Sequence, residues 1–296
     1  MTERRSGTQF EIMRHGHKKG EGLSEQGIEQ AKKKAHELYE RLKEIPAPAV
    51  IVLFSSNIGR AIDTKRTLES SLLDLVSQDG DFEAVSVKDA EKIDEAKTRT
   101  DKKLLITETA PQTMLGYSLR KEDLADSAFQ KWRSLYKDES IVGKIWTARK
   151  EEIPALKEEL RRTHPDIDPS TINPAEFIQT PEEYAFLAVD YVERMDQLSK
   201  KHFPDRPTHL VSVSHNYFSD WLTLMAMGKS INVESINELG GTYRDFVESS
   251  HLDVGNGELW VDYRGKQAHT PMTIQDVRKK LEKSMKEREK EWKEIE

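Results

Sequence analysis

The chain has 296 residues, with 46 basic against 53 acidic side chains and a net charge of −7. This length accommodates one α/β domain with an insertion, or two domains. The acidic balance disfavours a general nucleic-acid or membrane-surface binder, and no apolar run is long enough to span a bilayer. The chain has no cysteine, which excludes disulfides and is compatible with the cytoplasm, where we expect the protein to work.

The first predicted strand ends in reactive side chains. Residues 10–13 are partly apolar, and Arg14 and His15 follow them directly. Ligands of open α/β sheets bind beyond the carboxyl ends of the strands, so this pair is placed for chemistry rather than for packing. A helix is expected from Ser24, a good N-cap residue, to residue 45, where prolines end the apolar spacing.

Two later apolar runs end in the same way. Residues 49–54 lead to Arg60, which opens a predicted helix up to residue 76, and residues 209–214 lead to His215. If the three runs are neighbouring strands of one sheet, two imidazoles and two guanidiniums converge. Crowded cations repel one another and lower histidine pKa values. A phosphoryl group offsets that charge, and the arginine fork matches its oxygens, so the sequence predicts a phosphate site.

The remaining elements extend the sheet and its helices. We expect strands over 82–87, 243–248 and 258–263, helices over 180–198 and 216–227, and turns at 254–257 and 264–265. Between about residues 114 and 180 the chain changes to charged helical segments broken by prolines. We interpret this region as an insertion that caps the site.

The C-terminal residues 274–296 are predicted to form a charged amphipathic helix. Its apolar face is narrow and is interrupted by Arg288. Such a helix either docks on its own domain or pairs with a second copy to give a homodimer. We therefore divide the chain into a domain of residues 1–270, which contains the cap, and a C-terminal helix of residues 271–296.

Short motifs around these strand ends resemble the histidine phosphatase superfamily, also called phosphoglycerate-mutase-like. They occur in the family's order over about residues 8–68 and 180–228, and they are Arg14-His15-Gly16, Leu23-Ser24-Glu25-Gln26-Gly27, Ser56 with Arg60-Ala61 and Thr64, and Ser214-His215. The resemblance implies an α/β fold, a three-layer α/β/α sandwich with a mostly parallel central sheet and a helical cap insertion.

The same resemblance implies roles for four residues. His15 is the nucleophile that forms a covalent phosphohistidine, and Arg14, Arg60 and His215 bind the phosphate oxygens. A neutral imidazole can attack phosphorus without a metal when guanidiniums neutralise the phosphate. His15 and His17 fall on opposite faces of a strand, so we see no metal-ligand spacing and expect neither a metal nor a cofactor.

The leaving oxygen needs a proton, which a carboxyl group supplies in this family. Glu95 lies in an apolar-x-Glu step that looks like the family's acid-bearing segment, although it is further from Arg60 than expected. Glu108, after the apolar residues 104–106, is the alternative. We favour Glu95 narrowly.

The expected activity is hydrolysis of a phosphate monoester by a metal-independent phosphatase. The short basic loop at residues 17–22 disfavours a phosphoglycerate-type mutase, and Asn216 disfavours the acid-phosphatase branch, which has an aspartate there. A non-catalytic phosphate-binding or scaffolding protein of the same fold is the third alternative. The expected partner is a phosphorylated small molecule or a phosphoprotein, with no nucleic acid and no membrane.

Overall fold

The computed structural model describes residues 7–20, 22–115, 151–165, 180–215, 218–240, 248–255, 258–263 and 266–293. Its central feature is an eight-stranded sheet in the order β10-β9-β8-β1-β7-β4-β6-β5. The strands are β1 (Gly7–Arg14), β4 (Ala49–Ser55), β5 (Phe82–Ser86), β6 (Lys103–Thr107), β7 (Thr208–Ser214), β8 (Ser249–Gly255), β9 (Glu258–Tyr263) and β10 (Lys266–Thr273). A small hairpin of β2 (Lys18–Lys19) and β3 (Gly22–Leu23) follows β1.

The sheet has a parallel half and an antiparallel half. Strands β1, β7, β4, β6 and β5 run parallel to one another, whereas β8 is antiparallel to β1, and β8, β9 and β10 pair antiparallel in turn. The three runs that end in arginine or histidine are adjacent, because β7 lies between β1 and β4. Their carboxyl ends therefore share one edge of the sheet, as the sequence predicts.

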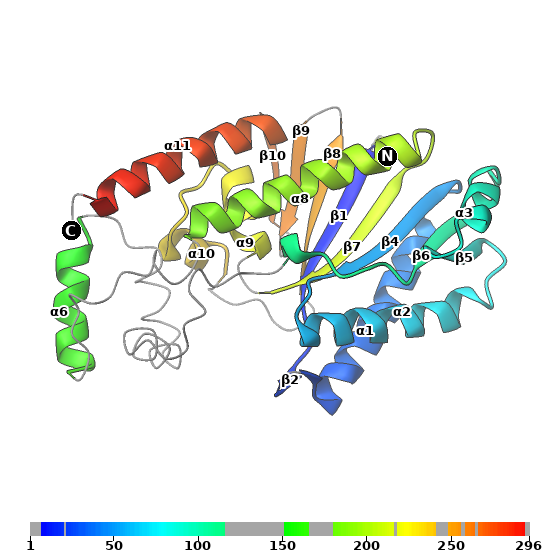
Figure 1. The fold of residues 1–296 in the computed structure, drawn as a ribbon, viewed down its shortest axis with the longest axis horizontal. Coiled ribbons are helices and arrows are strands. Elements are labelled where there is room, and N and C mark those ends of the chain that lie inside the picture. The colour runs from blue at the N-terminus through cyan, green and yellow to red at the C-terminus, as the bar shows by residue number, and fades with distance from the viewer. Residues whose placement is uncertain are drawn as a thin grey trace.

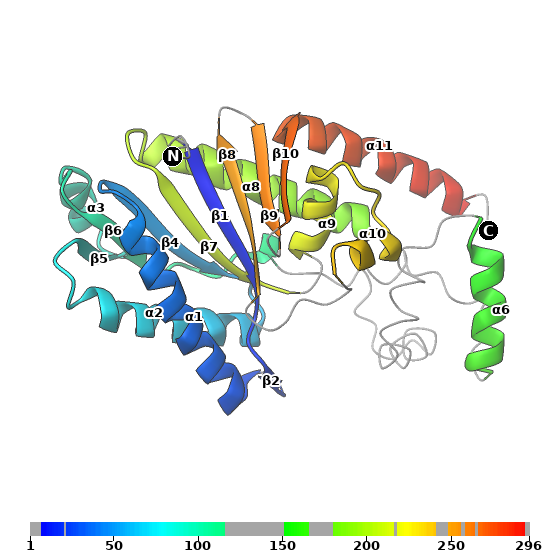
Figure 2. The ribbon, with the colours of Figure 1, turned by 180° about the vertical axis from the view of Figure 1, so that it is seen from behind.

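Helices cover both faces of the sheet, which gives three layers (Figure 1). Helices α1 (Glu25–Glu44) and α2 (Gly59–Val76) lie on one face, and α8 (Pro181–His202) and α9 (Phe218–Ala226) lie on the other. The view from behind shows the same division (Figure 2). The other helices are α3 (Ala90–Lys97), η1 (Thr113–Leu115), α6 (Ile153–Thr163), α10 (Val233–Glu238) and α11 (Ile274–Lys293). The expected α/β architecture is thereby confirmed.

The period of two in the strands produces two separate cores. In β4, Ile51 and Leu53 pack with residues of α1 and α2, while Val50 and Val52 pack with residues of α8 and α9. Successive side chains of a strand point to opposite faces, so a strand between two helical layers is apolar throughout. This explains why the run 49–54 has no alternation.

Local capping fixes the helices that begin near the site. Ser24 Oγ accepts a hydrogen bond from the backbone N–H of Gly27 at the start of α1. Helix α8 begins with a capping box, in which Thr180 and Glu183 satisfy each other's backbone N–H groups, and Pro181 occupies its first position. These contacts satisfy N–H groups that the first helical turn leaves without partners. Both helix starts agree with the sequence prediction.

The antiparallel half and one helix differ from the prediction. Strand β8 includes Val254 and Gly255, which the sequence pattern assigns to a turn, and β10 was not predicted. The residues around Glu95 form helix α3, capped by the side chain of Asp89, instead of following a strand directly. Strand β8 completes its hydrogen bonds against β1, a pairing between residues more than 200 apart that no local pattern encodes. The strand expected at 243–248 lies almost wholly outside the described residues.

The C-terminal helix α11 packs on α8 of the same chain. Val277 and Leu281 are fully buried there. Arg288 does not interrupt the buried face but belongs to it, because its Nε atom lies 2.7 Å from Glu182 Oε2 and both side chains are buried. Arg288 and Glu182 are far apart in the chain and pair only once the two helices have packed. The sequence pattern therefore showed Arg288 only as a break in the apolar stripe.

Most of the expected cap insertion lies outside the described residues. Helix α6 covers Ile153–Thr163, within the stretch where the sequence predicts charged helical segments, and Pro154 stands in its first turn. No helix in the described parts of the chain is long and apolar enough to cross a bilayer. The proposed division at residue 270 stays a prediction.

Candidate active site

The carboxyl ends of β1 and β7 bring two histidines together. Arg14 and Ser214 are register partners, and the backbone N–H of His15 donates to the carbonyl of Ser214 at 3.0 Å. His15 and His215 follow these paired residues, and their ring centroids are 5.3 Å apart. Both are buried, with 4% and 6% of their surfaces exposed. Strand register therefore positions the imidazole pair.

The hydrogen bonds of His15 define its tautomer. Arg60 Nε, which can only donate, lies 2.8 Å from His15 Nε2, so Nε2 is the acceptor. The ring proton must then be on Nδ1, which donates to the carbonyl of Gly16 at 2.8 Å. The lone pair of Nε2 faces a guanidinium, and that guanidinium is the natural partner of a phosphate oxygen.

Burial keeps the two imidazoles neutral. Burial is the largest cause that lowers the pKa of His15 to about 4; the Gly16 carbonyl raises this pKa, and the guanidiniums of Arg60 and Arg14 add to the lowering. The pKa of His215 is also lowered well below its ordinary value, first by burial and then by Arg60 and His15. A neutral imidazole has the free lone pair that a nucleophile needs. At neutral pH the imidazole of His15 is therefore neutral.

The lowered pKa of His15 gives a direct test. We expect its C2 proton resonance, assigned by its absence in His15→Ala, to titrate near pH 4 in the folded protein. Protonation of a buried imidazole beside two guanidiniums is unfavourable, so His15 holds its proton only below the range usual for histidine. A titration midpoint near 6.5 would contradict the burial and the Arg60 contact.

Helix α2 holds Arg60 and the loop after His15 in a fixed relation. Arg60 is the second residue of the helix, and Thr64 lies one turn later on the same face. The Thr64 hydroxyl donates to the carbonyl of Arg60 at 2.7 Å and accepts from the backbone N–H of Gly16 at 3.0 Å. Thr64 appears in the sequence motif without a role, and the structure gives it this one.

Ser56 is the buried partner of the second histidine. Its hydroxyl lies 2.8 Å from His215 Nε2, and the residue is fully buried at the carboxyl end of β4. The backbone N–H of Ser56 donates to the carbonyl of Val213 at 2.8 Å, which joins β4 to β7 next to His215. The orientation of the His215 ring therefore depends on a third strand.

Arg14 is the last residue of β1, and its backbone N–H donates to the carbonyl of Glu248 at 3.1 Å. Its guanidinium lowers the pKa of both His15 and His215, which places its charge near both rings. The described structure thus brings together the four residues predicted to bind and transfer phosphate, which are Arg14, His15, Arg60 and His215.

Two glycines allow the loop after His15 to lie against helix α1. A Cβ atom on Gly27 would stand 2.2 Å from the carbonyl oxygen of His17, and one on Gly16 would stand 2.8 Å from the carbonyl oxygen of Gly27. Both neighbours are backbone atoms, which cannot move away without shifting the loop.

We therefore expect Gly27→Ala to destabilise the protein by about 1 to 3 kcal/mol, the usual cost of overpacking, and to displace His15. Urea unfolding and the kcat of the purified variant measure the two effects. Gly80→Ala is the control, since a Cβ atom there meets nothing within 4 Å. Wild-type stability in Gly27→Ala would mean that the loop does not pack as described.

Glu95 lies away from this site. Its side chain is 67% exposed and pairs with Arg99. The carbonyls of the neighbouring residues Ala96 and Lys97 accept hydrogen bonds from Arg206, which precedes the first residue of β7. That end of β7 is opposite to the end that carries His215. The preference for Glu95 as the acid is therefore corrected: helix α3 places it at the wrong edge of the sheet.

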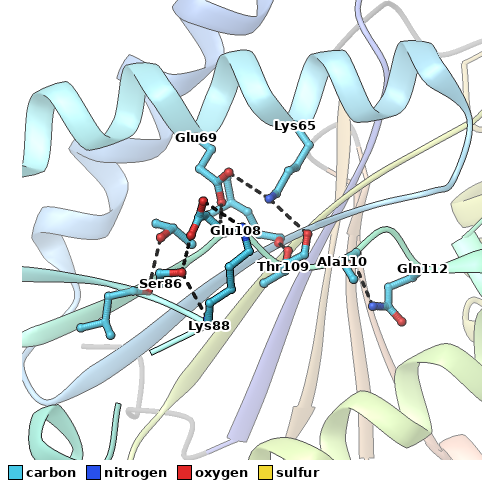
Figure 3. Close-up of polar contacts among 11 residues, drawn as sticks. Lys65, Glu69, Ser86, Lys88, Glu108, Thr109, Ala110 and Gln112 are labelled. Carbon is cyan, nitrogen blue, oxygen red and sulfur yellow. Dashed lines mark hydrogen bonds and ion pairs between the residues drawn. The ribbon is translucent and has the colours of Figure 1, made fainter. Parts of the chain in front are cut away.

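Glu108 follows β6 at the same edge as His15, but its carboxylate is turned to other partners. Ser86 donates to it, and Lys88 Nζ lies 3.3 Å from Oε1 (Figure 3). These contacts lower its pKa, Ser86 most of all, so the group is held as a carboxylate. Its backbone φ of +58° is in the left-handed region, which is costly for a non-glycine residue. As placed, Glu108 is not a prepared proton donor.

A buried ion pair next to this turn was not predicted. Lys65 and Glu69 of α2 are 5% and 8% exposed, and their charged atoms are 2.9 Å apart. The sequence carries a signal for it: both residues fall on the helical stripe of Ala61, Leu68 and Leu72, all of which are fully buried. Charged residues on a buried stripe at a spacing of four indicate an internal pair.

Among the described residues, no group of three or more histidine, aspartate or glutamate side chains is arranged to hold a metal ion. Positive charge acts on the His15 ring from the guanidiniums of Arg60 and Arg14 and from Lys18.

Comparisons with known proteins gave structural matches only. No protein-family model and no curated protein matches the sequence. The chain is similar to a phosphoglycerate mutase from Bacillus anthracis, with 14% identity, a TM-score of 0.42, and coverage of 92% of this chain and 96% of that chain. It is similar to Bacillus stearothermophilus YhfR at 14% identity and a TM-score of 0.46, over 88% and 98% of the two chains.

A mycobacterial glucosyl-3-phosphoglycerate phosphatase also matches, with 16% identity and a TM-score of 0.42, over 82% of this chain and 90% of that chain. Over most of its length the chain is therefore similar to solved phosphoglycerate mutase and phosphatase structures, at 14 to 16% identity and with TM-scores of 0.42 to 0.46.

Proposed function

We propose that the protein is a phosphohydrolase that forms a covalent phosphohistidine on His15. The single observation that carries the proposal is the contact between Arg60 Nε and His15 Nε2 at 2.8 Å, in a buried site that keeps the imidazole neutral. A nucleophile and a phosphate-binding guanidinium are in direct contact there. A phosphoryl group entering the site would take the arginine donor and free the Nε2 lone pair for attack.

The reaction has two steps. In the first, the lone pair of Nε2 forms a bond to phosphorus, and the bond from phosphorus to the leaving oxygen breaks. In the second, a water oxygen attacks the phosphorus, the P–N bond breaks and its electron pair returns to His15 Nε2, and the proton that the water loses passes to solvent, which balances the proton taken by the leaving oxygen. Arg14, Arg60 and His215 would stabilise the charge on the phosphoryl oxygens in both steps. The leaving alkoxide takes a proton from water, because the Glu108 carboxylate is held as an anion by Ser86 and Lys88.

The test is hydrolysis of an aryl phosphate in the presence of a metal chelator, together with trapping of the phosphoenzyme. We expect turnover that resists the chelator and a protein-bound phosphate that is labile to acid and stable to base, as P–N bonds are. A phosphate bond that survives acid would point to a hydroxyl nucleophile and would contradict the assignment of His15.

One observation favours a second candidate, a phosphate-binding protein without turnover. The Glu108 carboxylate is held as an anion by Ser86 and Lys88, and Glu95 lies at the other edge. A site with a nucleophile and anion-binding groups but no prepared proton donor would bind phosphate and transfer it slowly. Measurable binding of inorganic phosphate without hydrolysis of any monoester would support this candidate.

A further inference from the structure

Residues 108–115 run from the end of β6 past the carboxyl ends of β4 and β7. We call this segment the strap. It begins after β6 at the turn of Glu108 and ends in η1. We propose that the buried Lys65–Glu69 pair is a positioning device of the active site, which fixes the strap and through it the residues that orient His215. The inference rests on the proposed function, since His215 is one of its phosphate-binding groups.

The first end of the strap is attached to the ion pair (Figure 3). Glu69 accepts from Lys65 with one carboxylate oxygen, and from the backbone N–H of Glu108 with the other, at 2.9 Å in both cases. Lys65 also donates to the carbonyl of Thr109 at 3.4 Å. The pair therefore binds backbone groups of two consecutive residues of the strap, Glu108 and Thr109, and Glu108 is the residue with the left-handed backbone conformation.

The second end of the strap is attached to the strands that carry the site. The backbone N–H of Gln112 donates to the carbonyl of Ser55 at 2.7 Å, and Gln112 forms a parallel bridge with Ser56. The hydroxyl of Ser214 donates to the carbonyl of Leu115 at 2.6 Å. Ser56 is the hydrogen-bond partner of His215, and Ser214 precedes it, so the strap contacts His215's neighbours on both β4 and β7.

Helix α2 thereby links two parts of the site. Its first turns hold Arg60 and, through Thr64, the loop after His15. Its next turns hold the strap through Lys65 and Glu69. The left-handed backbone conformation of Glu108 is unfavourable unless its surroundings enforce it. The Glu69 carboxylate, which accepts a hydrogen bond from the backbone N–H of Glu108, is such a constraint. A buried ion pair stabilises a fold little compared with apolar residues of the same volume, so its stabilising effect does not explain its place here.

The test separates positioning from stability by replacing the pair with apolar residues. Lys65→Met/Glu69→Leu removes both contacts to the strap while conserving volume. Lys65→Met/Glu69→Gln removes the ion pair but keeps an amide oxygen that can accept from the N–H of Glu108. Lys33→Met/Glu37→Leu is the control, because Lys33 and Glu37 form an exposed pair with the same spacing.

In Lys65→Met/Glu69→Leu we expect kcat for an aryl phosphate to fall by about 10 to 100-fold, the scale of a small misplacement of catalytic groups, with the melting temperature close to that of the wild type. Amide exchange over 108–115 should rise, and the ring proton resonances of His215 should shift. The Glu69→Gln combination should restore most of kcat, and the Lys33/Glu37 control should change none of these quantities.

The outcomes distinguish this inference from the proposed function. A wild-type protein without hydrolysis would contradict the proposed function, but amide exchange and the His215 resonances would still report on the strap. An apolar double variant that folds with unchanged exchange over 108–115 would overturn the positioning role. The positioning role would also be overturned by a double variant in which amide exchange over 108–115 rises while kcat and the His215 resonances stay at their wild-type values.

Discussion

Replacement of His15 by alanine is expected to abolish the phosphoenzyme and to lower turnover of an aryl phosphate by roughly 10⁴ to 10⁶-fold, the range found when a covalent nucleophile is removed. His15 Nε2 is the atom that Arg60 contacts, and its proton is on the opposite nitrogen. Alanine leaves no atom that can form the P–N bond. Steady-state kinetics and phosphoenzyme trapping measure the loss.

His36→Ala is the matched control, because His36 is an exposed histidine in the middle of α1. It should retain wild-type turnover and phosphoenzyme. Thermal unfolding of His15→Ala shows whether the fold is intact, and retained binding of inorganic phosphate shows that the guanidiniums remain in place. Turnover within tenfold of the wild type in His15→Ala would rule out the phosphohistidine.

Replacement of Arg288 by methionine is expected to lower the free energy of unfolding by about 3 to 5 kcal/mol. This is the usual cost of removing one member of a buried ion pair while the other charge stays buried. Arg288 and Glu182 are 2% and 0% exposed, and 2.7 Å separates their charged atoms. Ser284 Oγ donates to the other oxygen of Glu182 at 3.4 Å, a longer contact than the 2.7 Å to the guanidinium. Urea unfolding with an unchanged m value measures the loss.

A double variant checks the physical cause. In Arg288→Met/Glu182→Leu neither charge of this pair is left buried, so most of the lost stability should return. Arg278→Met is the comparison on the same helix, because Arg278 pairs with Asp190 and Glu193 at side chains that are about one-fifth exposed. We expect a smaller loss there, since water screens a partly exposed pair. Equal losses at the two arginines would show that helix docking, not the buried charge, sets the stability.

The residues of the candidate site, and the strands and helices that carry them, could largely be predicted from the sequence. An unalternating apolar run predicted β4, because a strand between two helical layers is apolar on both faces. Ser24 predicted the start of α1, and Arg14, His15, Arg60 and His215 were each identified at the end of such a run or at the start of the helix that follows it. Each of these predictions depends on residues that are close together in the chain, so their identity and spacing are enough to make it.

The tertiary structure decided which strand ends lie side by side and which carboxylates lie near them. The place of β7 between β1 and β4 brought the two histidines to 5.3 Å, and helix α3 placed Glu95 at the opposite edge. The contact of Arg288 with Glu182 and the link from Glu69 to Glu108 join residues 106 and 39 apart in the chain. Strand order and the burial of a charge depend on surfaces that exist only once the layers have packed, and for that reason the sequence pattern alone did not contain them.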